Sequence, residues 1–396
     1  MIHADVTGAC LLPLQTGIPR TTRGMYRLLE EQWPGDIKPI FWQPFRGGYT
    51  QLSARARMLL QDPFASRRPS DRAPRDSTVP LLWASFSDLL GAWPRRVRLS
   101  QELRVGDTLL LTSLFPDNRL EYLERLIPGP GRKIAIFHDA IPLRDVNVAA
   151  WEKRRHLKTL RLLAKLDAVI AVSRAAADDL AALWREHGIK ARGPVCVLPW
   201  PVPFTTARPD FCEPPWTKKQ VLYVSRLKLL KNHATLFAAS AKLWDEGLDF
   251  ELQLIGCEDE ARESRAILRG VAQLQSEGRP VSWRGQVPED ELHRAYQRAT
   301  FTVFPSLAEG FGLPIIESFW HGRAVVCGDR GAMGELARGG GCLTADVQAA
   351  AALAAAMRSL LCDQAKCGAL AKEAYARPVR TWRDYGRELK LVLENR

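Results

Sequence analysis

The chain has 396 residues, which exceeds one ordinary hydrophobic core and suits two domains. It has no apolar run long enough to span a membrane, and its first residues, MIHADVTG, lack the pattern of a signal peptide. The eight cysteines are scattered without zinc-ribbon or redox spacing, and Cys362 and Cys367 are only a loose pair, so we expect reduced thiols in a cytoplasmic protein.

The net charge of +12 is concentrated in the first half. Residues 1–200 contain 30 Lys or Arg against 20 Asp or Glu, a balance of +10, whereas residues 201–396 contain 26 against 24, a balance of +2. Such a basic surface suits anionic lipid or a phosphate-bearing acceptor. The sequence has no nucleic-acid motif, so we expect no nucleic-acid partner. A solvated basic surface without any partner is the alternative.

Six short apolar runs with helical stretches between them predict strands in the first half: residues 2–6, 37–42, 108–112, 133–137, 168–172 and 195–198. Strands that alternate with helices favour a parallel, doubly wound sheet. Ligands of such sheets lie beyond the carboxyl ends of the strands, so the residues that follow each strand are candidates for a site.

Gly17 opens a turn after the first strand. The helix predicted next carries Arg20, Arg23 and Arg27, and at the ligand-binding edge these side chains could hold a phosphate. A lone glycine turn is a weak signal by itself, because helices often begin in this way.

Residues 43–80 are rich in proline, arginine and serine, which predicts a long mobile loop. The stretch after it mixes aromatic with basic side chains, namely Trp83, Phe86, Trp93, Arg95, Arg96 and Arg98. Two interpretations stay open: membrane docking, or a buried helix that ends in a solvated basic turn.

His138 and Asp139 stand at the carboxyl end of the fourth strand, where active sites lie in this class of sheet. We expect Asp139 to orient the turn or an acceptor. A basic helix, a strand and a second helix follow, and Ser173 is interpreted as the N-cap of that second helix.

Residues 200–216 contain proline throughout and no period, which indicates a domain linker. A second alternating series follows, with strands expected at residues 220–225, 251–255, 281–283, 301–304 and 324–327. Beyond these strands we expect a turn at Gly328 and Gly331, a helix that starts at Glu335, and further helices over residues 347–361 and at the end of the chain.

Arg226 and Lys231 lie five positions apart around the turn that follows the first strand of this series. Arg binds two oxygens in a fork and Lys acts as a point charge, so two cations at a strand end suit a diphosphate. Asn232 is expected to cap the next helix. The alternative for the two cations is solvated surface.

Residues 301–321, FTVFPSLAEGFGLPIIESFWH, predict a buried strand, a glycine-bearing turn and a helix with proline in its first turn. Free amides and the helix dipole then point at one spot, which Gly310 and Gly312 leave open to an anion. A carboxylate beside an anion site suits neutral hydroxyls, so Glu309 implies a ligand that is both anionic and polyhydroxylated. In the simpler alternative, Glu309 is a solvated loop acid and Glu317 complements the helix dipole.

The run EGFGLPIIE after FPS resembles the sugar-nucleotide motif of the family-4 retaining glycosyltransferases, which have the GT-B fold. The resemblance implies that Glu309 contacts the transferred sugar, that the amides of residues 310–312 meet sugar and phosphate, and that Glu317 binds the ribose. It covers most of the second half, and the first half mainly at TGIPR and FHDAIPL. Those two runs look like the mannosyltransferase branch of the family.

The other candidates take their roles from the same resemblance. The family carries R-x4-K for the diphosphate, which falls on Arg226 and Lys231, and a His-Asp before a long helix, which places His138 near the reacting carbon and the sugar hydroxyls. It has a glycine loop at Gly17 and contacts the base near Val287, before a helix capped around residues 288–290. The implied catalytic residues are His138, Glu309, Arg226 and Lys231, and the implied donor-binding residues are Gly17, Arg226, Lys231, Val287, Glu309, Gly310, Phe311, Gly312, Leu313 and Glu317.

The expected fold is therefore α/β GT-B, with two doubly wound, Rossmann-like parallel-sheet domains facing a central cleft. Residues 1–204 are expected to bind an acceptor, residues 205–378 a nucleotide sugar, and residues 379–396 to form a helix that crosses back to the first domain.

The expected activity is retaining transfer of a sugar to a glycan or lipid-linked acceptor in polysaccharide or glycoconjugate synthesis. GDP-mannose is the favoured donor, UDP-glucose and related donors stay open, and neither cofactor nor metal is expected. An anionic membrane surface is a further candidate partner, through peripheral association on the cytoplasmic face. The alternatives are a GT-B phosphorylase or epimerase, and a non-catalytic lipid- or glycan-binding protein.

Overall fold

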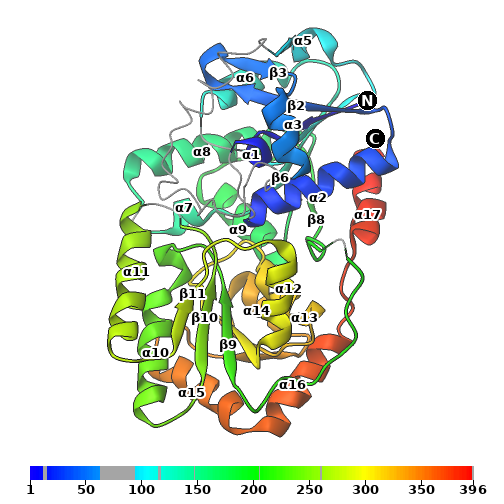
Figure 1. The fold of residues 1–396 in the computed structure, drawn as a ribbon. Helices are drawn as coiled ribbons and strands as arrows, with labels where there is room; N and C mark the ends of the chain where they lie inside the picture. The colour runs from blue at the N-terminus through cyan, green and yellow to red at the C-terminus, as the bar shows by residue number, and fades with distance from the viewer. Residues whose placement is uncertain are drawn as a thin grey trace. The chain divides into compact units, whose positions relative to one another are not determined.

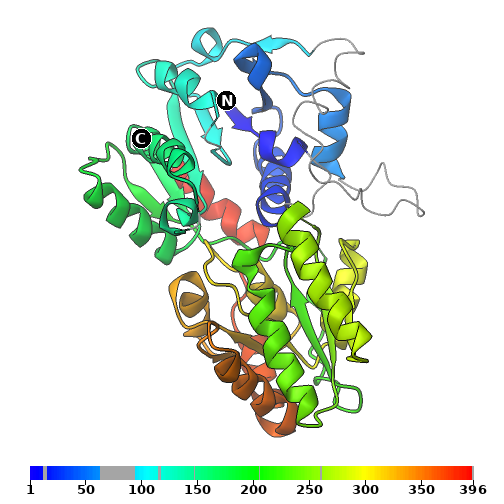
Figure 2. The same ribbon diagram turned by 90° about the vertical axis from the view of Figure 1, so that its left-hand side faces the viewer.

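The computed structural model describes residues 1–11, 16–62, 94–114, 117–146, 148–204, 206–258 and 261–394. These residues form two compact units. The first contains the described residues up to Pro203 together with those from Arg380 onward, and the second contains Phe204–Val379. Each unit is a sheet with helices on its faces (Figures 1 and 2). None of the described helices is long and apolar enough to span a bilayer.

The described part of the first unit contains an eight-stranded sheet in the order β4-β3-β2-β1-β5-β6-β7-β8. The strands are β1 (Ile2–Asp5), β2 (Ile37–Gln43), β3 (Gly48–Thr50), β4 (Arg96–Val97), β5 (Thr108–Leu111), β6 (Arg132–Phe137), β7 (Ala168–Ala171) and β8 (Val195–Val197). The six strands from β2 through β1 to β8 are parallel, and β3 and β4 extend them antiparallel. All six strands predicted for this half are confirmed. β1, β5 and β7 are buried along their whole length, because helices cover both faces.

The loop predicted over residues 43–80 is wrong for its first part. Residues 44–62 contain a 3-10 turn (Pro44–Arg46), β3 and α3 (Ala54–Gln61). Tertiary burial outweighs the loop-like composition here, because the Tyr49 ring packs edge-on against Trp42 at 5.1 Å and is fully buried. The remaining candidates of this region, Trp83, Phe86 and Trp93, lie outside the described residues.

The described helices of the first unit are α1 (Thr7–Cys10), α2 (Gly17–Gln32), α3, α5 (Leu99–Glu102), α6 (Arg119–Leu126), α7 (Ile141–Arg144), α8 (Ala150–Ala164), α9 (Arg174–Glu186) and α17 (Trp382–Glu394). Ser173 caps α9 as predicted, because its side chain accepts a hydrogen bond from the Ala176 N–H. The C-terminal helix α17 packs on α2. Gly24 of α2 makes this contact possible, since a Cβ there would lie 2.0 Å from the Trp382 ring.

The second unit has, in its described part, a six-stranded parallel sheet in the order β11-β10-β9-β12-β13-β14. Its strands are β9 (Gln220–Val224), β10 (Glu251–Ile255), β11 (Val281–Trp283), β12 (Phe301–Phe304), β13 (Val325–Cys327) and β14 (Cys342–Thr344). The five predicted strands are confirmed, and the three-residue β14 was missed. β9 and β12 are neighbours at the centre, so the loops beyond their carboxyl ends are adjacent.

The helices described in the second unit are α10 (His233–Asp245), α11 (Ala261–Ser276), α12 (Glu289–Arg298), α13 (Leu313–Trp320), α14 (Gly331–Ala337), α15 (Ala350–Cys362) and α16 (Gln364–Ala376). The helix expected from residue 347 begins three positions later, at Ala350. Glu335 does not start a helix as predicted; it lies inside α14, whose first turn begins at Gly331.

Candidate functional site

The loops after β9 and β12 meet at an ion pair between two predicted site residues. Lys231 Nζ lies 2.5 Å from Glu309 Oε1, and the two side chains are only 15% and 13% exposed. The backbones also join, since the Leu307 N–H donates to the Leu230 carbonyl at 3.0 Å. The interpretation of Glu309 as a solvated loop acid is therefore wrong.

Asn232 connects the loop after β9 to the loop after β12 through its side-chain amide. It has a left-handed backbone, with φ at 58°, and its Nδ2 donates to the carbonyls of Pro305 and Val347. It occupies the N-cap position of α10 as predicted, but its Oδ1 accepts from the Thr235 hydroxyl at 2.6 Å and not from a backbone N–H. The Tyr223 hydroxyl donates to the Lys231 carbonyl at 2.5 Å and fixes the same turn from the strand below.

Arg226 lies half-buried in the turn that follows β9. The neighbouring loop after β10 approaches this turn closely, because Gly256 has φ at 152° and a Cβ there would overlap the Ser225 carbonyl. The Leu227 N–H donates to the Cys257 carbonyl at 3.0 Å. The backbone that carries Arg226 is thus fixed on both sides before any ligand arrives.

The glycine turn leads directly into α13. Gly312 has φ at 106° at the N-cap, a conformation that residues with a side chain rarely adopt. Leu313 begins the helix, with proline in its first turn as predicted, and Phe311 is buried beneath it. The start of α13 carries the positive end of the helix dipole, which favours an anion there. Proline at position 314 has no N–H, and the Ile315 N–H donates to the Gly312 carbonyl at 3.0 Å.

Glu317 lies in the second turn of α13, and it is only 2% exposed. Its Oε2 accepts a hydrogen bond of 2.6 Å from the hydroxyl of Tyr296 on α12. An acid that complements the helix dipole would lie at the surface in the first turn. Glu317 is buried and lies in the second turn, so that alternative is wrong. Sequence reasoning missed Tyr296, because its spacing on α12 is that of any core aromatic residue.

Val287 is buried between β11 and the Pro288 N-cap of α12. β11 is the edge strand, so β10 and β9 separate it from β12. No hydrogen bond or ion pair described here joins Val287 to the pair of Lys231 and Glu309. A hollow of about 390 Å³ lies at the amino-terminal ends of β9, β10 and β11, against residues 217–219, 249–251 and 280–282, away from the loops at the carboxyl ends.

His138 of the first unit follows β6 and is half-buried. Its Nε2 lies 2.8 Å from the Thr112 carbonyl oxygen, and its ring stacks on Trp200 with centroids 6.0 Å apart. Burial lowers the pKa of His138 below its ordinary value. Asp139 accepts a hydrogen bond from the Ile141 N–H at the start of α7, so it orients this turn as expected.

Gly17 is the first residue of α2, and the arginines that follow it have different environments. Arg23 is buried and donates to the carbonyls of Leu59 and Ala9, both at 2.7 Å. Its role is to hold α3 and α1 against α2, so the phosphate interpretation is wrong for Arg23. Arg27 is exposed and donates to the Gln61 carbonyl.

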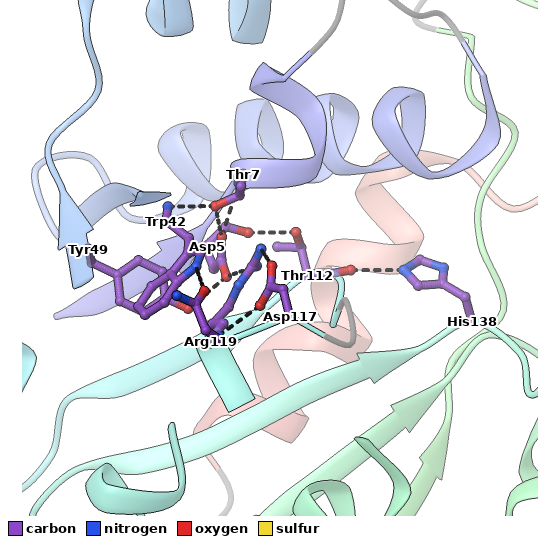
Figure 3. Close-up of polar contacts among 9 residues, drawn as sticks. Asp5, Thr7, Trp42, Tyr49, Thr112, Asp117, Arg119 and His138 are labelled. Atoms are coloured by element: carbon purple, nitrogen blue, oxygen red, sulfur yellow. Dashed lines mark hydrogen bonds and ion pairs between the residues drawn. The ribbon is translucent and has the colours of Figure 1, made fainter. Parts of the chain in front are cut away.

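A buried ion pair lies at the carboxyl end of β1 in the first sheet (Figure 3). Asp5 Oδ2 and Arg119 Nη1 are 2.7 Å apart, and both side chains are 1% exposed. Tyr49 donates its hydroxyl to the same carboxylate oxygen, and Thr7 donates to the other. Sequence reasoning missed the pair. The available signal was a charged residue at the end of an otherwise apolar strand run.

Comparisons with known proteins bear on the second unit most directly. Residues 218–363 match the family described as glycosyl transferases group 1. The serotype-specific mannosyltransferase WbdA of Escherichia coli is 28% identical over 200 residues, which cover 46% of this chain and 24% of WbdA. D-inositol 3-phosphate glycosyltransferase of Corynebacterium urealyticum is 29% identical over 180 residues, which cover 44% of this chain and 42% of that protein. The chain thus spans less than half the length of these curated relatives.

Solved structures match over both units. Sucrose-phosphate synthase from Thermosynechococcus elongatus superposes with a TM-score of 0.69 at 18% identity, over 100% of this chain and 98% of that one. An α,α-trehalose-phosphate synthase from Burkholderia vietnamiensis superposes with a TM-score of 0.57 at 14% identity, over 75% of this chain and 76% of that one. The chain is family-4-like and has the GT-B fold.

The matched span of this family-4-like chain contains every candidate of the second unit, from Arg226 to Glu317. Gly17 and His138 lie outside it. In the described parts of the chain no group of three or more His, Cys, Asp or Glu is placed to hold a metal ion. Independence from metal stays a prediction.

Proposed function

We propose that this family-4-like chain is a retaining glycosyltransferase that transfers mannose from GDP-mannose to a hydroxyl of a glycan or lipid-linked acceptor, in polysaccharide or glycoconjugate synthesis. The observation that carries the proposal is the ion pair of Lys231 with Glu309 beside the N-terminus of α13. The pair and this helix end together supply a cation, a carboxylate and the positive end of a helix dipole at the carboxyl ends of two central strands. A nucleotide sugar needs these three groups together.

The diphosphate is the leaving group of the proposed reaction, and negative charge grows on it as the sugar departs. Arg226 and Lys231 supply two positive charges, and the first turn of α13 adds the positive end of its dipole. The backbone around Arg226 and the start of α13 is fixed before the donor arrives, which limits reorganisation during the reaction. Lys231 is held by Glu309 in the free protein and moves toward the diphosphate when the donor binds. That arrangement would make a metal ion unnecessary.

The carboxylate of Glu309 would repel a diphosphate if it stood alone. Lys231 neutralises it in the free protein, which explains how a carboxylate is tolerated beside an anion site. When a donor binds, the ammonium group of Lys231 is proposed to contact a phosphate oxygen as well as Glu309. Glu309 then accepts hydrogen bonds from the sugar hydroxyls.

Glu317 is proposed to bind the ribose. Its carboxylate is anchored at Oε2 by the Tyr296 hydroxyl, so its direction is set before the nucleoside binds. Carboxylates accept two or more hydrogen bonds, and ribose offers two hydroxyl donors. Val287 is proposed to contact the base, and its buried position before α12 is consistent with an apolar contact.

His138 is proposed to position the sugar while oxocarbenium character develops at the reacting carbon. No carboxylate is assigned as a covalent nucleophile. Mannose is favoured because WbdA is a mannosyltransferase by name, and so is the O-antigen chain mannosyltransferase B of Escherichia coli, which is 45% identical over 47 residues.

The basic first unit is proposed to bind an anionic membrane surface that holds the acceptor. Arg96 is an exposed residue of the edge strand β4, and the exposed Arg95 and Arg98 flank that strand. The helix α8 offers a second candidate surface, with Trp151 at its start 56% exposed and with the exposed cations Arg154, Arg155, Lys158 and Arg161. Each cation near an acidic leaflet contributes about 1 kcal/mol, so three or four suffice for reversible association.

A panel of nucleotide sugars, with nucleotide release measured in the presence and absence of an acceptor lipid, tests the proposal. Acceptor-dependent release of GDP from GDP-mannose supports it. Phosphate-dependent release would indicate a phosphorylase, and conversion of the donor without acceptor an epimerase. Binding without turnover of any donor would indicate a non-catalytic protein. The Glu309→Gln variant is the control for contaminating activity.

A further inference from the structure

We propose that the Thr112 carbonyl holds His138 in the tautomer protonated at Nε2, so that Nδ1 accepts a hydrogen bond from a substrate hydroxyl. The identity of that hydroxyl rests on the proposed function. The tautomer of His138 and the buried network that sets it are independent of the proposed function. Figure 3 shows the network, which runs from Arg119 through Asp5 and Thr112 to His138.

The first step concerns the proton. His138 Nε2 and the Thr112 carbonyl oxygen are 2.8 Å apart, and a carbonyl oxygen can only accept. Nε2 must therefore carry the hydrogen. A neutral imidazole has one N–H, so Nδ1 holds the lone pair. Burial lowers the pKa of His138, which keeps the ring neutral at physiological pH.

The second step concerns the orientation of the ring. The His138 ring stacks on Trp200 with 21° between the planes, and Trp200 stacks in turn on Tyr385 with centroids 5.2 Å apart. Both supporting rings are buried. The hydrogen bond fixes the direction of Nε2 and the stack fixes the plane, so the direction of the Nδ1 lone pair is determined as well.

The third step concerns what holds Thr112. Its hydroxyl donates to the Asp5 carbonyl at 2.6 Å, which fixes the end of β5 against the end of β1. The Asp5 carboxylate is in turn bound by Arg119, and by the N–H and the hydroxyl of Thr7. Thr112 and Asp5 are therefore positioning residues, because they act on a substrate only through His138.

The chemical consequence concerns the sign of the interaction. A lone pair directed at a substrate accepts from a hydroxyl and adds negative potential near it. That potential favours the positive charge of an oxocarbenium-like transition state, whereas an imidazolium at the same place would oppose it. His138 thus orients a hydroxyl, and it does not protonate a leaving group through Nδ1.

The tautomer can be observed without turnover. The full-length chain is labelled with 15N at histidine, and long-range proton–nitrogen correlations are recorded at neutral pH. The His138→Gln variant identifies the His138 signals by their loss. We expect one protonated nitrogen, at Nε2, and an unprotonated Nδ1. A proton on Nδ1, a charged ring, or averaging between the two tautomers would overturn the proposal.

The positioning role is tested by a double-mutant cycle. Thr112→Val removes the hydroxyl at nearly constant volume and should lower kcat roughly tenfold with donor affinity unchanged. Thr112→Ser should restore the rate. In a His138→Gln background, Thr112→Val should have no further effect. Additive losses in the double variant would show that Thr112 does not act through His138.

Thr108→Val is the matched control, because Thr108 is also buried but lies at the opposite end of β5. Its kcat should be unchanged. If Thr112→Val fails to fold, the nitrogen spectrum of the unmodified chain still decides the proposal. A protonated Nε2 in a chain that transfers no sugar would leave the tautomer standing and remove the proposed function.

Discussion

Lys231 and Glu309, which come from neighbouring loops 78 positions apart in the sequence, form an ion pair of 2.5 Å at the carboxyl ends of β9 and β12. The resemblance assigned the first to the diphosphate and the second to the sugar. Because they are in direct contact, each charged group stabilises the charge of the other. A donor must therefore compete with Glu309 for Lys231, and substitution of either residue alone leaves the other uncompensated.

The first prediction follows from this pairing. Lys231→Ala or Arg226→Ala should lower turnover by roughly a hundredfold or more, because each removes one fixed charge from the leaving group. Lys218→Ala is the control, since Lys218 is an exposed cation just before β9, at the amino-terminal ends of the strands. Steady-state kinetics with the best donor provide the measurement. Near-normal rates in both variants would disprove the diphosphate assignment.

The second prediction separates the two acids. Glu309→Gln should lower kcat, because it weakens contacts with the sugar that matter most in the transition state. Glu317→Gln should mainly weaken nucleotide binding, and Tyr296→Phe should do the same more mildly by releasing Oε2. Calorimetry with the nucleotide diphosphate measures the second effect. The roles must be exchanged if only Glu309→Gln reduces nucleotide affinity.

The third prediction concerns metal. Treatment with a chelator should change the rate little, because Arg226, Lys231 and the N-terminus of α13 are proposed to carry the charge compensation. The same assay after dialysis into added magnesium or manganese is the comparison. A strict requirement for either ion would contradict the proposed role of the two cations.

The fourth prediction concerns stability. Arg119→Met should lower the free energy of unfolding of the first unit by about 3–5 kcal/mol, because it leaves the buried Asp5 carboxylate without its cation. Arg125→Met, on the exposed side of the same helix, should cost little. Denaturant titration followed by tryptophan fluorescence compares the two. Equal stabilities would mean that water reaches Asp5.

The fifth prediction concerns the basic surface. The chain should float with vesicles that contain acidic lipid, and added salt should release it, because the attraction is screened over about 10 Å at ordinary ionic strength. Neutralising Arg95, Arg96 and Arg98 together should weaken the binding. The same change at Arg154, Arg155 and Lys158 tests α8 separately. Equal behaviour on neutral and acidic vesicles would exclude the membrane as partner.

The sequence predicted the parallel strands of both sheets well, since buried strands such as β7 and β13 are short continuous apolar runs between turns. It predicted less where tertiary contacts decide the structure. Tyr49 and its strand lie in a stretch with loop composition, and only the partners that bury its ring reveal a strand there. β14 is too short for a periodic signal.

The candidate site shows the same division. The motif from Glu309 to Glu317 located the turn and the helix, because glycine and proline have strong local preferences. The side-chain partners could not be predicted, since Tyr296 and Thr112 are ordinary residues whose roles depend on distant strands. Asn232 illustrates the difference: its position before a helix suggested a cap, but its amide binds carbonyls of two other loops.

The return of α17 to the first unit bears on how the protein is made. Tyr385 of α17 stacks on the Trp200 ring, which in turn stacks on His138. Trp382 of α17 packs directly against Gly24. A ribosome finishes all of the second unit before it makes Tyr385 and Trp382, because Phe204–Val379 is inserted within the first unit. The second unit can therefore fold while the first is still incomplete. His138 therefore acquires its final orientation only after α17 has left the ribosome.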